Sequence, residues 1–197
     1  LAAAAARAQY GCYGEGRISA RYPPPTGIPT SGFTFCRLMY TQVRGEPMGM
    51  GWRTDYPGAE RNLMIRTSEL TKTRVHFESP GQPAHYVVRM TDDALFQCPF
   101  AMASDVGTIG LSEAEAVSLR AYLQKGGFLW VDDFWGDAAW EQWATEIGKV
   151  LPPSDYPIVD IRPGDSLYRA ILNVPDVPQV SNIQFWRGVG GSTTSER

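Results

Sequence analysis

Carboxylate side chains follow three of the apolar runs that the sequence predicts as strands. Asp132 and Asp133 come directly after the most apolar run, Asp55 follows the first run, and Asp92 and Asp93 follow the second. Adjacent carboxylates at the end of a strand can bind a divalent ion or act as general acid and general base. Because the carboxyl ends of parallel strands lie at one edge of a sheet, these residues predict an acidic rim. Such a rim suits a cation or a polyhydroxylated ligand better than a phosphate.

Each of these carboxylates also has a structural explanation. Successive side chains of a continuing strand point to opposite faces, so Asp132 and Asp133 need not share a site, and one of them can cap the next turn or helix. Asp55 opens a predicted helix, where a capping role is expected. Trp135 either packs in the core or stacks on a sugar or a partner surface. The candidate ligand rim is therefore Asp55, Asp132, Asp133 and Trp135, with no catalytic residue, metal ion or cofactor assigned to it.

Composition and missing motifs exclude several classes of protein. The chain has 197 residues, a net charge of −3 and no basic run, which argues against a general nucleic-acid binder. The sequence contains no Gly-x-Ser-x-Gly elbow, no phosphate-binding loop, no dinucleotide-binding Gly-x-Gly-x-x-Gly after a strand and no His-Glu-x-x-His. It also lacks an apolar run of about 20 residues, so no transmembrane span is predicted.

The first residues predict export. Residues 1–8 read LAAAAARA, in which Ala6, Arg7 and Ala8 fit the small-x-small rule of signal peptidase, with Gln9 as the first mature residue. An alanine-rich helix is the alternative interpretation of this composition. We predict a signal-peptide remnant over residues 1–8 and a protein that is periplasmic or secreted.

Three cysteines are too few for a disulfide framework. Cys36 and Cys98 each lie in an apolar, strand-like run, where a buried free thiol is the expectation. Neither these cysteines nor the two histidines have the close spacing of a zinc site.

The pattern over residues 33–187 is that of one α/β domain. Strands are expected at 33–40, at 85–90, within 98–103, at 128–131 and at 156–161, with a candidate strand at 183–186. Helices are expected at 57–72, from the capping box of Ser112 and Glu115 to the glycines at 126–127, and after a cap at Asp137. The continuous apolar run at 128–131 predicts a central strand that is buried on both faces. The alternation predicts a three-layer, flavodoxin-like α/β fold with a mainly parallel sheet.

Regions of different composition flank this domain. Residues 9–32 form a polar, proline-rich N-terminal arm, and its triple proline at 23–25 favours an extended path. We expect this arm either to float or to lie on a partner. Residues 188–197 are polar and rich in glycine, and they predict either a flexible tail or a truncated continuation of the domain.

Several segments together resemble the bacterial domain-of-unknown-function family four-one-five-nine. They are 52–60 (WRTDYPGAE), 68–71 (SELT), 95–100 (LFQCPF), 126–136 (GGFLWVDDFWG) and 185–186 (FW), of which the fourth is the most specific. The resemblance spans about residues 33 to 197, and it implies an exported protein whose fold is similar to that of class I glutamine amidotransferases. In those enzymes a nucleophilic cysteine follows the central strand, whereas Asp132, Asp133 and Phe134 stand at that place here. Glutaminase chemistry is therefore not expected.

Two functions of different classes follow from these observations. The first is a non-catalytic interaction module outside the cytoplasmic membrane, which contacts protein partners at the membrane surface through its arm, its tail and exposed aromatic residues. The chain resembles family members from photosynthetic bacteria, and one version is an extrinsic subunit that stabilises a photosynthetic reaction-centre and light-harvesting complex. The alternative is a carbohydrate-related binding protein or hydrolase that uses Asp55, Asp132 and Asp133.

Overall fold

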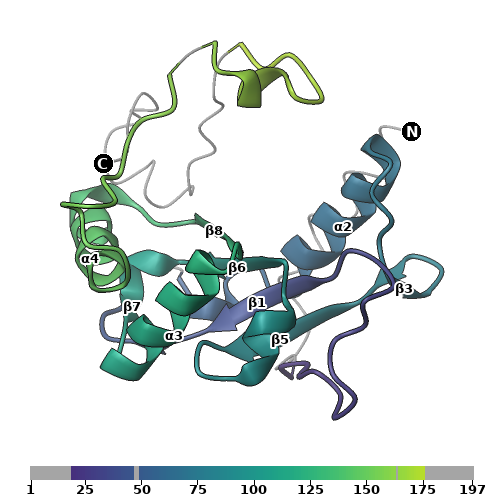
Figure 1. Cartoon of the computed structure of the whole chain (residues 1–197), viewed down its shortest axis with the longest axis horizontal. Helices are drawn as coiled ribbons and strands as arrows, with labels where there is room; N and C mark the ends of the chain where they lie inside the picture. Colours follow the sequence, from purple (N-terminus) through teal and green to yellow (C-terminus); the bar gives the residue numbers. More distant parts are fainter. Residues whose placement is uncertain (1–18, 47–48, 163, 176–197) are drawn as a thin grey trace.

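A parallel sheet of four strands forms the centre of the protein (Figure 1). The computed structural model describes residues 19–46, 49–162 and 164–175. Across the sheet the strands run β5 (His85–Arg89), β1 (Phe35–Met39), β6 (Phe100–Ser104) and β8 (Phe128–Asp132), and every pair is parallel. In chain order this is 2-1-3-4, the order with which flavodoxin-like sheets begin. The predicted α/β class with a mainly parallel sheet is confirmed.

Helices cover both faces of the sheet and complete three layers. On one face, Met64 of α2 (Gly58–Leu70) packs with Phe35 and Met102. On the other face, α3 (Glu113–Gln124) and α4 (Gly136–Val150) pack into the larger core cluster, where Leu119 and Trp143 lie. The predicted capping box is confirmed at the start of α3, where the Ser112 hydroxyl accepts from the Glu115 N–H.

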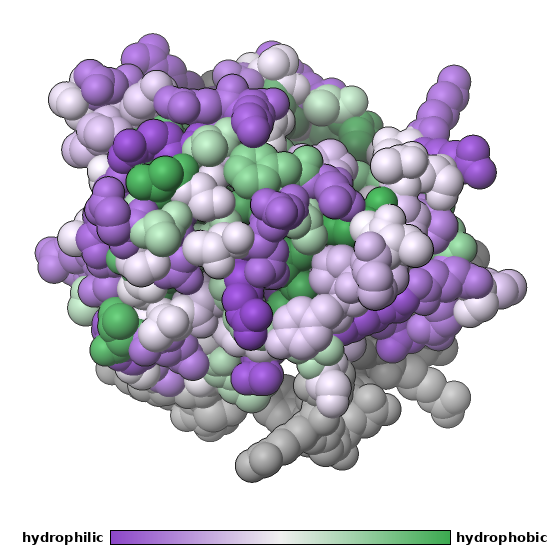
Figure 2. Space-filling model, turned by 60° about the horizontal axis from the view of Figure 1, so that its bottom comes forward, coloured by the Kyte–Doolittle hydropathy of each residue, from purple (hydrophilic) through white to green (hydrophobic). Residues whose placement is uncertain are grey.

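Short elements connect these layers. The remaining strands form two small antiparallel pairs: β2 (Thr41–Gln42) with β7 (Ile109–Gly110), and β3 (Phe77–Ser79) with β4 (Gln82–Pro83). The 3₁₀ helices in the described residues are η2 (Gly51–Arg53), η3 (Asp93–Gln97), η4 (Val106–Thr108) and η5 (Ser166–Arg169). No helix in the described part of the chain is long and apolar enough to cross a membrane. The side that Figure 2 brings forward is mostly hydrophilic, with small hydrophobic areas in between.

The described part of the N-terminal arm lies on its own domain. The Val87 N–H of β5 donates to the Arg21 carbonyl at 2.7 Å, so the arm occupies the outer edge of this strand. The Arg21 side chain pairs with Glu78, and Ile28 is buried in the core. Residues 19–32 therefore lie on their own domain, which is neither of the two paths that we expect for the arm from the sequence. Residues 9–18 lie outside the described part, as do residues 1–8 and 188–197.

The prediction of free thiols at Cys36 and Cys98 is wrong, because the two residues form a disulfide. Cys36 lies in β1, and Cys98 precedes β6 instead of lying within a strand. Since β1 and β6 are neighbours in the sheet, the Cα atoms of Cys36 and Cys98 lie 6.0 Å apart. The order of the strands in the sheet brings the two cysteines together. Their spacing in the sequence does not predict this contact.

Two expectations about strands are also wrong. The sequence predicts the run at 128–131 at the centre of the sheet, yet β8 is one of the two edge strands of the described sheet. Residues 156–161 were expected to form a strand, yet they are irregular and exposed. No described strand pairs with the outer edge of β8. In addition, α4 begins at Gly136, so Asp137 lies in its first turn instead of capping it.

Candidate functional site

Carboxylates from four loops meet at the carboxyl edge of the sheet. We call Glu46, Asp55, Asp105, Asp132 and Asp133 the carboxyl-edge cluster. The negative charges of Asp55 and Asp132 both act on Asp133, and those of Glu46 and Asp133 act on Asp105. The three predicted aspartates thus lie at one edge of the sheet, while Asp92 and Asp93 lie beyond β5, where the Asp92 carboxylate accepts from the Arg89 N–H.

Asp105 is a buried member of the cluster that the sequence reasoning missed. It follows β6 directly, in a left-handed conformation with φ of 56°. Its Oδ2 accepts from the Gly51 N–H at 2.7 Å and so holds η2 against the end of β6. Burial above all, and then the charge of Glu46, raises the pKa of Asp105 to about 7. The position directly after a strand would have identified it, as it did Asp132.

Asp132 and Asp133 are held by different partners. The Ser104 hydroxyl donates to Asp132 at 2.9 Å, and the indole N–H of Trp135 donates to Asp133 at 3.1 Å. Burial raises the pKa of Asp132, while burial followed by the charge of Asp55 raises the pKa of Asp133 to about 6. Asp133, with φ of 55°, shares the left-handed conformation of Asp105, which aspartate adopts more readily than most residues.

A fully buried ion pair lies on the α2 face of the sheet. Arg37 of β1 donates from Nε to Glu60 in the first turn of α2, and neither side chain is exposed to solvent. The two terminal nitrogens of Arg37 and the second oxygen of Glu60 have no hydrogen-bond partner. The positive charge of Arg37 acts on Asp132 and opposes the effect of its burial. The sequence did not reveal this pair, because an arginine and a glutamate are rarely fully buried.

The carboxyl-edge cluster can hold and transfer protons, since carboxyl groups with raised pKa values lie beside other carboxylates. No group of three or more histidine, cysteine or acidic side chains in the described residues is arranged to hold a metal ion. The turn after β8 carries Asp133 and Phe134 in place of a cysteine or serine, and Cys98 is oxidised in its disulfide. This arrangement lacks the nucleophile that amidotransferase chemistry needs.

A second candidate surface lies on β8. Phe128 is 55% exposed and Trp130 is 51% exposed. Both lie on the face that carries Phe100, whose ring stacks on that of Phe128 with centroids 5.6 Å apart. Leu129 and Val131 point the other way and pack against the main core cluster. We call Phe100, Phe128 and Trp130 the β8 face.

Comparison with known proteins agrees with the resemblance found in the sequence. A search of the curated proteins returned no match to the chain. A family model described as "Domain of unknown function (DUF4159)" matches residues 34–196, which is most of the chain and includes every strand of the central sheet and every described α-helix. The chain therefore belongs to the DUF4159 family.

Proposed function

We propose that the protein is a non-catalytic interaction module that receives a partner protein on the β8 face. The observation that carries this proposal is the exposure of Phe128 and Trp130 on a strand of a parallel sheet. Strands of parallel sheets are ordinarily covered on both faces. Aromatic side chains contribute much of the binding energy when a partner covers them.

The free edge of β8 supports the same proposal. The opposite edge of the sheet is occupied by the N-terminal arm through Arg21, whereas no described strand pairs with β8 on its outer side. From Phe128 to Val131 the strand has no proline, lysine or other charged residue, which are the usual devices that prevent edge pairing. An extended segment of the partner would add to this edge as a further strand. The carboxylates of Asp132 and Asp133 favour a basic residue at the corresponding end of that segment.

We place this activity outside the cytoplasmic membrane. A disulfide between two core cysteines is typical of proteins that fold in an oxidising compartment, which accords with the predicted signal-peptide remnant. The specific version of the proposal is an extrinsic subunit that stabilises a photosynthetic reaction-centre and light-harvesting complex, and it rests on the resemblance to family members from photosynthetic bacteria. In this version the protein is associated with the membrane through its partners.

Native purification of the full chain tests the proposal. The double variant Phe128→Ser, Trp130→Ser is compared with Val117→Ser, which removes an apolar side chain of similar exposure from α3. We expect the wild type and the Val117 variant to co-elute with the same identified partner after gentle solubilisation of native membranes, and the double variant to elute alone. A wild-type protein that runs as a free monomer, or a double variant that keeps the partner, would refute the proposal.

A carbohydrate-related binder or hydrolase is the second candidate function, and the carboxyl-edge cluster favours it. With a pKa of about 7, the Asp105 carboxyl is protonated to a large extent near neutral pH, as a general acid requires, whereas Asp133, with a pKa of about 6, is mostly ionised there, as a general base requires. Trp135, beside Asp133, provides an aromatic ring of the kind on which sugars stack. The variants Asp132→Asn and Asp133→Asn test this function across a screen of sugars and metal ions. Unchanged binding and turnover in both variants would refute the carbohydrate-related function.

A further inference from the structure

We infer that an apolar tip on the segment after α4 closes over the β8 face when no partner is bound. The tip consists of Leu167, Ile171 and Leu172, which lie in η5 and shortly after it. The inference rests on the proposed function, because it assigns a form of regulation to the surface that receives the partner. The β8 face then alternates between a segment of its own chain and a partner protein.

The segment that carries the tip has a local structure of its own. Asp165 caps η5 by accepting from the Leu167 N–H at 2.9 Å. The Val174 N–H donates to the Tyr168 carbonyl at 2.8 Å and so folds the end of the segment back onto η5. A preorganised segment loses little conformational freedom when it docks, so it binds better than a loose one.

The apolar side chains of the tip are exposed to solvent in this open arrangement. Leu167, Ile171 and Leu172 are 61%, 61% and 63% exposed. Single exposed apolar residues are common on soluble proteins, whereas a group of them marks an interaction site. The tip and the β8 face are two such groups in one chain, one aliphatic and one aromatic.

The tip and the β8 face lie on the same side of the sheet. Phe100 of the β8 face packs against the core cluster that contains Met64 of α2, so this face is on the α2 side. In Figure 1 the segment leaves α4, rises past β8 and carries η5 at the top of the view, where α2 also lies. Because β8 is an edge strand, the chain can pass from the α4 side to the α2 side around its free edge.

The length of the connection allows the tip to close. Residues 151–165 join α4 to η5 and, at about 3.3 Å per residue, reach up to about 50 Å. Strand β8 has five residues and is about 17 Å long. A tether of this length holds the tip near the β8 face at an effective concentration of about millimolar. Burial of aliphatic against aromatic side chains supplies the attraction.

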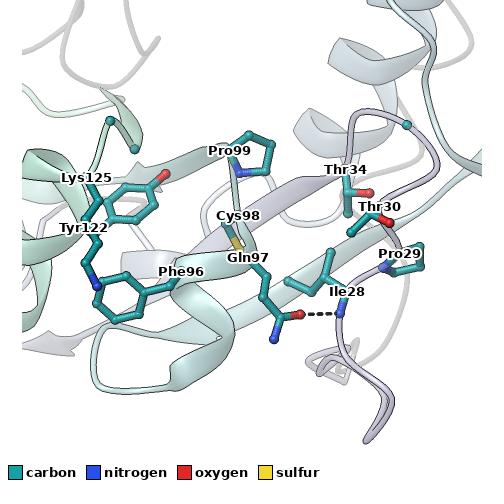
Figure 3. A pocket seen from close by; sticks show the side chains of 13 residues that line it. Ile28, Pro29, Thr30, Thr34, Phe96, Gln97, Cys98, Pro99, Tyr122 and Lys125 are labelled. Atoms are coloured by element: carbon teal, nitrogen blue, oxygen red, sulfur yellow. Dashed lines mark hydrogen bonds between the residues drawn. The ribbon is translucent and has the colours of Figure 1, made fainter.

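The opposite edge of the sheet is already covered by a segment of the same chain. The N-terminal arm pairs with β5 through Arg21, and its Ile28 N–H donates to the Gln97 side chain at 2.8 Å (Figure 3). Closure of the tip covers the other edge strand in a comparable way. A partner must then displace the tip, so its apparent affinity is reduced to the extent that the β8 face is closed.

The fluorescence of the dye 1-anilinonaphthalene-8-sulfonate, which binds exposed apolar surface, tests the closure without any partner. The double variant Leu167→Ser, Leu172→Ser is compared with the wild type and with the control Val117→Ser, each as the purified full chain. If the tip covers the β8 face, the double variant uncovers that face, and the dye fluorescence rises although two apolar side chains are removed. If the tip does not dock, the variant only loses exposed apolar surface, and a fluorescence at or below that of the wild type would overturn the inference.

A combined variant identifies the surface that the tip uncovers. Phe128→Ser and Trp130→Ser, added to the double variant, should abolish the rise in dye fluorescence. A rise that persists in this combined variant would come from another surface or from loss of packing, and it would also overturn the inference. The control Val117→Ser should keep the fluorescence of the wild type.

Photo-crosslinking is a second measurement, and it leaves the tip unchanged. Benzoylphenylalanine replaces Trp130 and keeps an aromatic ring there, and the purified protein is irradiated in dilute solution. We expect an adduct with residues 164–175 at the mass of a single chain. No adduct with this segment, or an adduct only at the mass of two chains, would contradict the closure. Partner binding without closure would refute this inference alone, and closure without a partner in native membranes would refute the proposed function alone.

Discussion

Reduction of the Cys36–Cys98 disulfide is expected to lower the free energy of unfolding by about 4 kcal/mol. The bond closes a loop with a sequence separation of 62 residues. In the chain-entropy treatment, a cross-link removes about 2.1 + 1.5R ln n cal/mol/K from the unfolded chain, which is roughly 14 cal/mol/K for this loop. At about 298 K this entropy corresponds to about 4 kcal/mol, a large part of the stability of an ordinary domain.

Urea unfolding followed by tryptophan fluorescence measures this effect, with and without a reductant. Because Cys12 is the third cysteine, alkylation of the denatured protein should label one thiol before reduction and three thiols after it. Cys12→Ser is the matched control and should respond to the reductant as the wild type does. Equal unfolding midpoints with and without reductant, or three labelled thiols before reduction, would refute the reasoning.

Two further predictions concern buried charges. Glu60→Ala leaves the Arg37 guanidinium buried and unpaired, so we expect a loss of about 3–5 kcal/mol in urea unfolding. The control Glu69→Ala breaks an exposed pair with Arg66 and should cost about 0.5 kcal/mol or less; equal costs would contradict the account. The raised pKa of Asp105 means that its contribution to stability is complete below about pH 4 and is lost as the pH rises towards its folded-state pKa of about 7. Asp105→Asn should therefore be more stable than the wild type at pH 8, by up to about 4 kcal/mol, with the advantage shrinking towards pH 4; parallel stability profiles against pH would speak against this.

The sequence predicted the class of the fold but not the position of each strand in the sheet. Apolar runs and the capping box of Ser112 are local signals, and they identified the strands and the start of α3. The apolar run at 128–131 has the composition of a fully buried strand and so predicts a central one, although β8 is an edge strand of the described sheet. Strand order depends on packing between residues that are distant in the sequence, so a local pattern does not predict it. For the same reason, local patterns did not predict the contact between Cys36 and Cys98.

The candidate site was predicted in part for the same reason. The rule that ligand groups follow strands located Asp55, Asp132 and Asp133 at one edge of the sheet. It was not applied to Asp105, which directly follows β6 and is the most buried carboxylate of the cluster. A pocket at the other edge of the sheet is lined by residues of the N-terminal arm, of 96–99 and of 122–127 (Figure 3). Because these segments are distant in the sequence, no local motif predicts the pocket.

Photo-crosslinking from the β8 face tests the proposed function most directly. A photoreactive amino acid replaces Trp130 in one protein and Val117 of α3 in another, and each is activated in native membranes or cell envelopes. We predict a covalent adduct with a different polypeptide from position 130 and none from position 117. Absence of an adduct at position 130, or an adduct there only with a second copy of this chain, would contradict the claim that the β8 face receives a partner protein.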